Sequence, residues 1–386
     1  MITLVTNRKN LVLLFFGYPS QPPTAGGLVW TKRVADHIEK NETLMVKKIS
    51  NDRAVLKKIS NNISIRKAAF YLVDEMHDAL NGFSKSPDIA ILDSWGIANI
   101  ILWILIRLFK PEAKILTVFH HYEPRVTRTK NPFVRAFEVT YNWLCEIGTK
   151  AMIRNSNRVL TVSLSSAKQL NSICGLVNSK SNKVAVVGAA IDAFPICSKK
   201  EKKNIDFLCI GRIEKFTGLE KIWKLIREMY SNVKFVMIGR ATPEDIQRLQ
   251  ILGIDHRGMV SIAEKIELYK RARVFVFPSA REGFGISVAE ALYAGLSVVS
   301  WKLPVFEEIY DNNSRYLNIK LVEFGDCQKF AEEALRSLKK VDRKTTIQNE
   351  PAESHLEVNN TWEHVAKNVM AVIRDFKPID STKISQ

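Results

Sequence analysis

Residues 273–300 read RVFVFPSAREGFGISVAEALYAGLSVVS and have the order strand, loop, helix and strand. The run 274–277 is apolar, β-branched and aromatic, and Pro278 ends it, as expected for a strand that is buried on both faces. Residues 287–294 are good helix formers, a glycine follows them, and residues 296–300 resume a strand. This alternation predicts an α/β fold built on a parallel sheet.

The loop in this stretch carries the residues with the most chemical interest. Glu282 is followed by Gly283, Phe284 and Gly285, and the two glycines remove Cβ atoms where a ligand would approach the backbone. The free N–H groups at the start of the next helix face the carboxyl end of the preceding strand, where anions bind in α/β folds. Glu290 lies one turn into that helix, so two carboxylates flank one predicted anion site. Either glutamate alone is more often a solvated surface residue.

Length and composition are those of an ordinary globular protein. The chain has 386 residues, 46% hydrophobic and 25% charged, which predicts two or three domains. The cysteines have no C-x-x-C spacing and no neighbouring histidine cluster, so we expect free buried thiols in a reducing compartment. They are Cys145, Cys174, Cys197, Cys209 and Cys327.

No stretch of the sequence reaches the ~18 apolar residues of a membrane span. Residues 97–109 come nearest, and Arg107 interrupts them. A buried helix is expected there, and a helix lying against a membrane surface is the alternative. Residues 11–16 are apolar but too short for a signal peptide.

The net charge of +17 lies mostly in the N-terminal half, where residues 1–196 carry 26 Lys and Arg against 14 Asp and Glu. The densest basic run covers residues 32–67 and includes Lys57 and Lys58; a second basic stretch includes Arg125 and Arg128. These residues form either solvated helix faces or a patch for anionic lipid head groups or a phosphorylated acceptor. Nucleic acid is a weaker interpretation, because the sequence has no helix-turn-helix, zinc-finger or RNP-like pattern.

Strand-like runs alternate with helical ones through this half of the chain. Gly26 and Gly27 close a loop rich in proline and glycine and open a helix predicted over residues 28–39. The strand 115–119 delivers His120 and His121 at its carboxyl end. The other predicted strands are 10–17, 44–49, 89–92, 159–162 and 184–190.

The pattern restarts after a lysine-rich connector at residues 198–204. Residues 205–210 predict a strand, Gly211 and Arg212 a turn, and residues 218–229 a helix. Thr361 is placed to cap a last amphipathic helix. The predicted domains are residues 1–196, residues 197–360, and residues 361–386 as a helix that returns to the first domain, plus a tail.

Taken together, these features resemble the retaining GT-B glycosyltransferases of family 4. The segment from Glu282 to Glu290 resembles the E-x7-E motif of that family, and Gly211-Arg212 resembles its phosphate-binding G-R. The glycine pair, His120, residues 159–163 and the sequence GAAIDAF at residues 188–194 are similar to its other motifs. The resemblance implies two Rossmann-like domains facing each other across a cleft, the first binding the acceptor and the second a nucleotide sugar.

The resemblance also implies roles for single residues. His120 and Glu282 would be catalytic, with His121 as an alternative to His120. Glu290 would bind the donor ribose. Thr217 stands where the family usually has a lysine, and Lys215, two residues earlier, would reach the diphosphate instead. The remaining expected donor-binding residues are Gly26, Gly27, Arg212, Gly283, Phe284, Gly285 and Ile286.

The expected activity is hexosyl transfer with retention of configuration, from a UDP-, GDP- or ADP-linked sugar to a glycan or lipid-linked or phosphorylated acceptor. The sequence has no D-x-D triplet, which favours stabilisation of the leaving diphosphate by fixed donors, with no metal and no cofactor. A cytoplasmic location is expected, with an anionic membrane surface as a partner and no nucleic acid. The alternatives are a GT-B epimerase or hydrolase of sugar nucleotides and, ranked lower, a non-enzymatic protein that binds nucleic acid or a membrane surface.

Overall fold

The computed structural model describes most of the chain. The described residues are 12–16, 18–19, 26–42, 44–49, 76–81, 83–94, 96–122, 132–175, 183–192, 203–311, 318–343 and 361–376. By backbone contacts the chain divides into two compact units. Unit 1 comprises Met1–Ala189 and Trp362–Gln386, and unit 2 comprises Ala190–Thr361.

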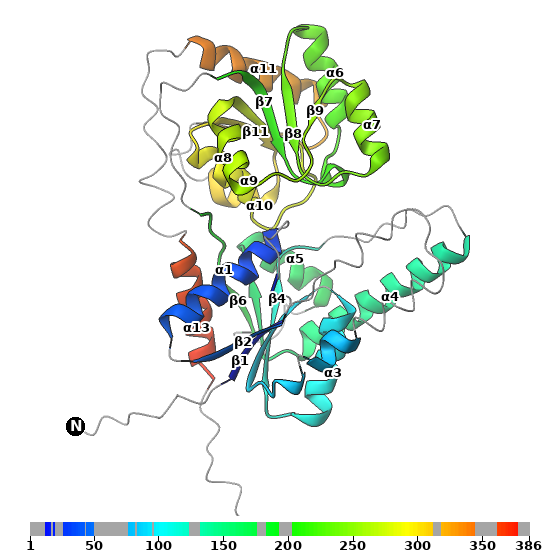
Figure 1. The fold of residues 1–386 in the computed structure, drawn as a ribbon, viewed down its shortest axis with the longest axis vertical. Coiled ribbons are helices and arrows are strands. Elements are labelled where there is room, and N and C mark those ends of the chain that lie inside the picture. Colours follow the sequence, from blue (N-terminus) through cyan, green and yellow to red (C-terminus); the bar gives the residue numbers. More distant parts are fainter. Residues whose placement is uncertain are drawn as a thin grey trace, which may run out of the picture. The chain divides into compact units, whose positions relative to one another are not determined.

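Unit 1 is built on a six-stranded parallel sheet with helices on both of its faces (Figure 1). Across the sheet the strands are β2 (Met45–Ile49), β1 (Val12–Phe16), β3 (Ile89–Asp93), β4 (Lys114–Phe119), β5 (Arg158–Thr161) and β6 (Val184–Val186). Its helices are α1 (Gly26–Asn41), α3 (Ile97–Phe109), α4 (Pro132–Asn155), α5 (Leu164–Cys174) and α13 (Trp362–Arg374). Helix α13 comes from the C-terminal end of the chain and packs on α1.

Unit 2 repeats this architecture with a second six-stranded parallel sheet. Its strand order is β12 (Ile319–Val322), β11 (Ser297–Trp301), β10 (Ala272–Phe277), β7 (Ile205–Ile210), β8 (Phe235–Ile238) and β9 (Asp255–His256). Its α-helices are α6 (Leu219–Met229), α7 (Pro243–Ile251), α8 (Ile262–Arg271), α9 (Ile286–Tyr293), α10 (Pro304–Phe306) and α11 (Cys327–Arg343). A 3-10 turn at Ile213–Lys215 follows β7, and a π-helical turn at Glu307–Asp311 follows α10.

The central strands are mostly apolar because both faces of each sheet are covered. In β7 and β10 the residues from Phe207 to Ile210 and from Val274 to Phe277 are buried. Because all strands of a sheet run the same way, the loops after them gather at one edge, which we call the carboxyl edge. Both predicted groups of functional residues follow strands and so lie at these edges.

Several predicted boundaries differ from the structure. The glycine pair was predicted to lie before the helix, but α1 begins at Gly26 and includes both glycines in its first turn. Residues 187–190 lie outside β6, which is three residues long. Strand β12 and helix α7 were not predicted. The helix α7 starts with a capping box between Thr242 and Asp245, a signal that the sequence does contain.

The cysteines agree with prediction where they are described. Cys145, Cys174, Cys209 and Cys327 are free and buried, and Cys197 lies outside the described residues. In the described part of the chain, no helix is both long and apolar enough to span a membrane.

Candidate functional site

In unit 2 the loops after β7 and β10 are joined by their backbones. The amide N of Thr217 donates to the carbonyl of Pro278 at 2.8 Å, and the amide N of Ala280 donates to the carbonyl of Lys215 at 2.9 Å. Strands β7 and β10 are neighbours in the sheet, so both loops leave from the same point of the carboxyl edge. The stretch from Arg212 to Thr217 is therefore fixed beside the loop that carries Glu282.

The turn after β7 also touches the turn after β8. A Cβ atom on Gly239 would lie 1.9 Å from the carbonyl oxygen of Gly211, so only glycine allows this backbone approach. The amide of Ile213 donates to the carbonyl of Arg240 at 3.4 Å. The sequence Gly-Arg thus occurs at the ends of two adjacent strands, and both arginines start from the carboxyl edge. The guanidinium of Arg212 lies 3.5 Å from the carboxylate of Glu214.

Glu282 is oriented by a side chain of its own loop. The hydroxyl of the buried Ser279 donates to Oε1 of Glu282 at 2.8 Å. Gly283 is buried, and Phe284 is partly buried. Gly285 has φ of 84° and lies directly before α9, and a Cβ atom there would lie 2.4 Å from Phe306. Only glycine fits between the loop and Phe306 at this position. The amide groups of Ile286 and Ser287 follow it in the first turn of α9, where backbone N–H groups have no partner within the helix.

Glu290 on α9 is buried and held by two side chains of α8. Lys265 Nζ donates to one carboxylate oxygen at 2.6 Å, and the Tyr269 hydroxyl donates to the other at 3.0 Å. Burial, followed by the charge of Glu290, raises the pKa of Tyr269 well above its usual value, so the hydroxyl keeps its proton and remains a donor. Each oxygen of Glu290 accepts one bond from α8 and retains a lone pair for a ligand.

In unit 1, His120 follows β4 and contacts the first turn of α1. A Cβ atom on Gly27 would lie 3.1 Å from both Cδ2 and Nε2 of the His120 ring. The indole of Trp30, one turn further along α1, meets the same ring edge-on, with ring centroids 5.8 Å apart. Asp93, the last residue of β3, places a carboxylate oxygen 4.0 Å from His120 Nε2. The structure therefore brings together two predicted features of this unit, the glycine pair and His120.

The remaining predicted motifs of unit 1 support this arrangement through hydrogen bonds. Ser163 caps α5 by accepting from the amide of Ser166 at 3.0 Å, and the Ser166 hydroxyl donates to the carbonyl of His120 at 2.5 Å. Trp30 Nε1 donates to the carbonyl of Gly188 at 3.0 Å. The segment predicted at residues 159–163 is thus linked to His120 through Ser166, and Gly188 of the other segment accepts from Trp30, which packs against His120. Phe194 lies outside the described residues.

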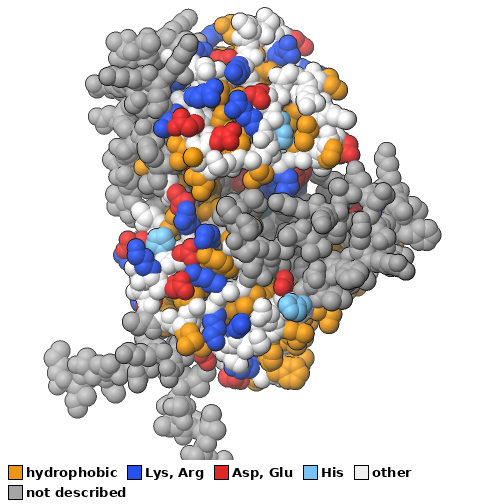
Figure 2. Space-filling model, viewed as in Figure 1, with side chains coloured by type: hydrophobic (Ala, Val, Ile, Leu, Met, Phe, Trp, Pro, Cys, Tyr) orange, Lys and Arg blue, Asp and Glu red, His pale blue; other side chains and the backbone are white. Residues whose placement is uncertain are grey.

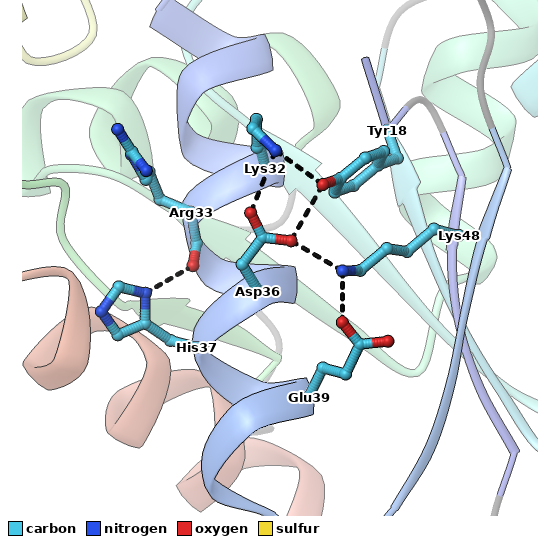
Figure 3. A network of polar contacts seen from close by, with 7 residues as sticks. All are labelled: Tyr18, Lys32, Arg33, Asp36, His37, Glu39 and Lys48. Carbon is cyan, nitrogen blue, oxygen red and sulfur yellow. Dashed lines mark hydrogen bonds and ion pairs between the residues drawn. The ribbon is translucent and has the colours of Figure 1, made fainter. Parts of the chain in front are cut away.

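The basic run predicted at residues 32–67 is partly neutralised within the unit (Figure 3). Asp36 accepts from Lys48 at 2.6 Å, Lys32 at 3.1 Å and the Tyr18 hydroxyl at 2.9 Å, and Lys48 also pairs with Glu39 at 2.6 Å. Burial tends to raise the pKa of Asp36, but the three hydrogen bonds outweigh it and leave the pKa below its usual value. Figure 2 accordingly has Lys and Arg side chains beside Asp and Glu over α1 and α13.

The four residues predicted for an acceptor or membrane patch are not among the described residues. They are Lys57, Lys58, Arg125 and Arg128. Among the residues that the structure does describe, no group of three or more His, Cys, Asp or Glu side chains could hold a metal ion.

Sequence reasoning missed four residues that hold the candidate side chains. Asp93 could have been found from the sequence, because it is an acid that directly follows the predicted strand 89–92. Ser279 was harder to find, because its only sequence feature is its position after Pro278, at the start of the loop. Lys265 and Tyr269 had no such feature, because their contact with Glu290 depends on how α8 packs against α9.

The two parallel-sheet units define the GT-B fold, and solved structures agree. The chain resembles a sucrose-phosphate synthase from Thermosynechococcus elongatus with a TM-score of 0.68 and 14% identity, covering 95% of this chain and 99% of that one. It resembles the catalytic domain of starch synthase IV from Arabidopsis thaliana, bound to ADP and acarbose, with a TM-score of 0.67, 14% identity and the same coverage. The predicted fold class is therefore confirmed.

The family model described as glycosyl transferases group 1 matches residues 190–340, which lie in unit 2. The predicted resemblance to this group is confirmed. The O-antigen chain mannosyltransferase RfbU of Salmonella typhimurium is 27% identical over 181 residues, which cover 44% of this chain and 49% of that protein. The chain thus spans about half the length of this curated relative.

Proposed function

We propose that the protein transfers a hexose from a nucleotide sugar to an acceptor, with retention of configuration and without a metal. The observation that carries this proposal is the backbone pairing of the loops after β7 and β10. It fixes Arg212 and Lys215 beside Glu282 and the start of α9, where an anion is favoured. The match of residues 190–340 to the group 1 glycosyltransferases supports the same conclusion.

Departure of the nucleoside diphosphate concentrates negative charge on the phosphate oxygens. The Arg212 guanidinium and the first amide groups of α9 would bind those oxygens, with Lys215 as a further cation. Glu214, 3.5 Å from Arg212, would yield this position to the donor. No ion is required for this role, because preorganised N–H donors stabilise developing charge where water is excluded.

The two carboxylates of this region would bind different parts of the donor. Glu290 would accept hydrogen bonds from the ribose hydroxyls through the lone pairs that Lys265 and Tyr269 leave unused. Glu282, oriented by Ser279, would contact the transferred sugar, and the backbone from Gly283 to Ile286 would reach its hydroxyls. Gly26 and Gly27 are assigned to donor binding, and the imidazole of His120, 4.0 Å from the carboxylate of Asp93, is assigned to orienting the transferred sugar near the acceptor.

The acceptor is proposed to be a glycan or a lipid-linked or phosphorylated molecule, met at the cytoplasmic face of a membrane. The similar protein RfbU is named as an O-antigen chain mannosyltransferase, which supports a mannosyl or related donor. The nucleotide is the first unknown to resolve. Thermal-shift measurements with UDP, GDP, ADP and their sugars would resolve it, because a ligand that binds the folded state alone raises the apparent stability.

Three variants test the site. Arg212→Ala and Glu282→Ala should each abolish transfer, and Arg212→Ala should also remove the thermal shift caused by the nucleotide. Arg271→Ala is the matched control, because Arg271 directly precedes β10 and so lies at the opposite edge of the sheet. Wild-type transfer by either site variant would refute the assignment. Formation of an epimer or free sugar from the donor, without acceptor and faster than transfer, would favour the epimerase or hydrolase alternative.

A further inference from the structure

Helix α4 of unit 1 exposes large apolar side chains around its middle, between residues 139 and 147. With 24 residues it is about 36 Å long. Two contacts of described residues hold its second half: Ile100 of α3 packs at Gly148, and Arg154 donates to the carbonyl of Cys174 at the end of α5. Figure 1 shows the first half of α4 extending beyond α3 and the sheet.

Four large apolar side chains are exposed between residues 139 and 147, around the middle of the helix, with the carboxylate of Glu146 among them. Val139, Trp143, Leu144 and Ile147 are 51%, 59%, 50% and 47% exposed. The other exposed residues described between 135 and 147 are Arg135, Ala136 and Thr140. At 100° per residue these seven cover about half of the helix circumference. Exposed helix faces are normally polar, so this apolar stripe, defined as Val139, Trp143, Leu144 and Ile147, requires an occupant.

Charge favours a lipid bilayer as that occupant. Arg135 is the one charged residue among the seven, and no acid occurs in the sequence from residue 124 to residue 137, which contains three further basic residues. A basic segment followed by an apolar helix face with a tryptophan is the pattern of helices that lie in the interface of anionic membranes. Tryptophan is suited to this position because its ring is apolar and its N–H is polar.

The topology places the stripe where a membrane would be useful. Helix α4 runs back along the sheet between β4 and β5, so it starts toward the carboxyl edge, the edge that carries His120, and the stripe begins in this half of the helix with Val139 and Trp143. We propose that the apolar stripe of α4 docks unit 1 on an anionic lipid bilayer, which would present a lipid-linked acceptor at that edge. That a docked protein would act on a lipid-linked acceptor rests on the proposed function. Binding of the stripe to the bilayer does not rest on it.

The test measures binding of the full chain to vesicles in the absence of any donor. Wild-type protein should co-sediment with vesicles of phosphatidylcholine and phosphatidylglycerol and much less with phosphatidylcholine alone. The double variant Trp143→Ser, Leu144→Ser should lose roughly tenfold or more of this binding, since each side chain contributes over 1 kcal/mol when it leaves water. The matched control is Ile251→Ser, Ile262→Ser, which replaces two unit 2 side chains that are 84% and 59% exposed.

Because all four positions are exposed, both variants should fold, and circular dichroism with the nucleotide thermal shift would verify this. Equal binding by wild type and stripe variant, an equal loss in the control, or equal binding to both lipid compositions would overturn the proposal. So would a dimer in sedimentation velocity that the stripe variant disrupts while vesicle binding is unchanged. Stripe-dependent vesicle binding without any nucleotide shift would leave the docking intact and refute the proposed function instead.

Discussion

Gly27 lies directly against the imidazole of His120, with no room for a methyl group between them. A Cβ atom on Gly27 would be 3.1 Å from two atoms of the ring, a contact that requires one partner to move by a few tenths of an ångström. Trp30 meets the ring edge-on, and the Ser166 hydroxyl fixes the backbone of His120 by donating to its carbonyl oxygen. Glycine at position 27 therefore sets where the imidazole lies.

Substitution of Gly27 should thus reduce activity more than stability. In Gly27→Ala the gain in helix propensity, about 1 kcal/mol, offsets the tight contact, and in Gly27→Val the branched side chain displaces the ring. We expect transfer to fall by roughly tenfold in Gly27→Val, with a smaller loss in Gly27→Ala and little change in melting temperature. Lys40→Val, at an exposed position of the same helix, is the control. Full activity in Gly27→Val would contradict the role of this contact.

A second prediction concerns the two α8 side chains that hold Glu290. Removing Lys265 leaves a buried carboxylate with one partner, so the position of Glu290 should become less fixed. Lys265→Met should raise the KM for the donor several-fold and change kcat little, and Tyr269→Phe should act in the same direction.

The control for Lys265 lies on the same helix. Lys270 pairs with Glu267 at 2.9 Å on the surface, and Lys270→Met should leave the donor KM unchanged. An equal KM for the donor in wild type and Lys265→Met would show that Glu290 does not depend on this lysine.

The sequence was sufficient to locate most strands and the loops that follow them. Pro278 and the glycines around it end β10 and begin α9 whatever the tertiary context, because they restrict the backbone locally. Parallel strands then place the loops with Arg212 and Glu282 at one edge of the sheet. These relationships depend on pattern and topology, which are both readable from the sequence.

Contacts between helices were not readable in the same way. Lys265 and Tyr269 precede Glu290 by 25 and 21 residues, and their convergence depends on how α8 and α9 pack. Residues 97–109 are the most apolar stretch of the sequence, and α3 buries five of them but exposes Ile104, Leu108 and Phe109, so the expected buried helix is buried on one face only. Helix α4 has a lower mean hydropathy and still bears the apolar stripe. Composition records how apolar a helix is, but packing decides which of its faces is exposed.

The approach of Gly239 to Gly211 predicts a large effect of a small substitution. In Gly239→Ala the new methyl group would lie 1.9 Å from a backbone oxygen, which cannot rotate away as a side chain would. We expect a loss of about 3 kcal/mol or more in unfolding free energy, or a displaced Gly211-Arg212 turn with weaker nucleotide binding.

Gly258 provides the matched control for backbone conformation. Its φ of 65° also lies in the left-handed region, but nothing lies within 4 Å of its Cβ position. Gly258→Ala should therefore cost only about 1 kcal/mol, the price of the conformation alone. Equal melting temperatures for the two variants would show that the backbone contact at Gly239 can relax.

The buried thiol of Cys209 predicts how the stability of unit 2 depends on pH. Burial in β7 raises the pKa of Cys209 well above its usual value of 9.0. Above about pH 9 the unfolded chain has released a proton that the folded chain retains, so this group lowers the free energy of unfolding by up to about 1.4 kcal/mol per pH unit. Below pH 9 both states hold the proton, and the group has no effect.

Cys209→Ala isolates this dependence from that of other groups. At pH 8 the variant should be less stable than wild type by about 1–2 kcal/mol, because it leaves a small cavity. As the pH rises above 9, wild type alone bears the thiol penalty, so the difference should shrink by about 1.4 kcal/mol per unit and then change sign. Val236→Ala, a cavity without a titrating group on the adjacent strand β8, should keep a constant difference from wild type in denaturant titrations from pH 8 to 10.5. A constant difference for Cys209→Ala as well would mean that the thiol ionises within the folded unit.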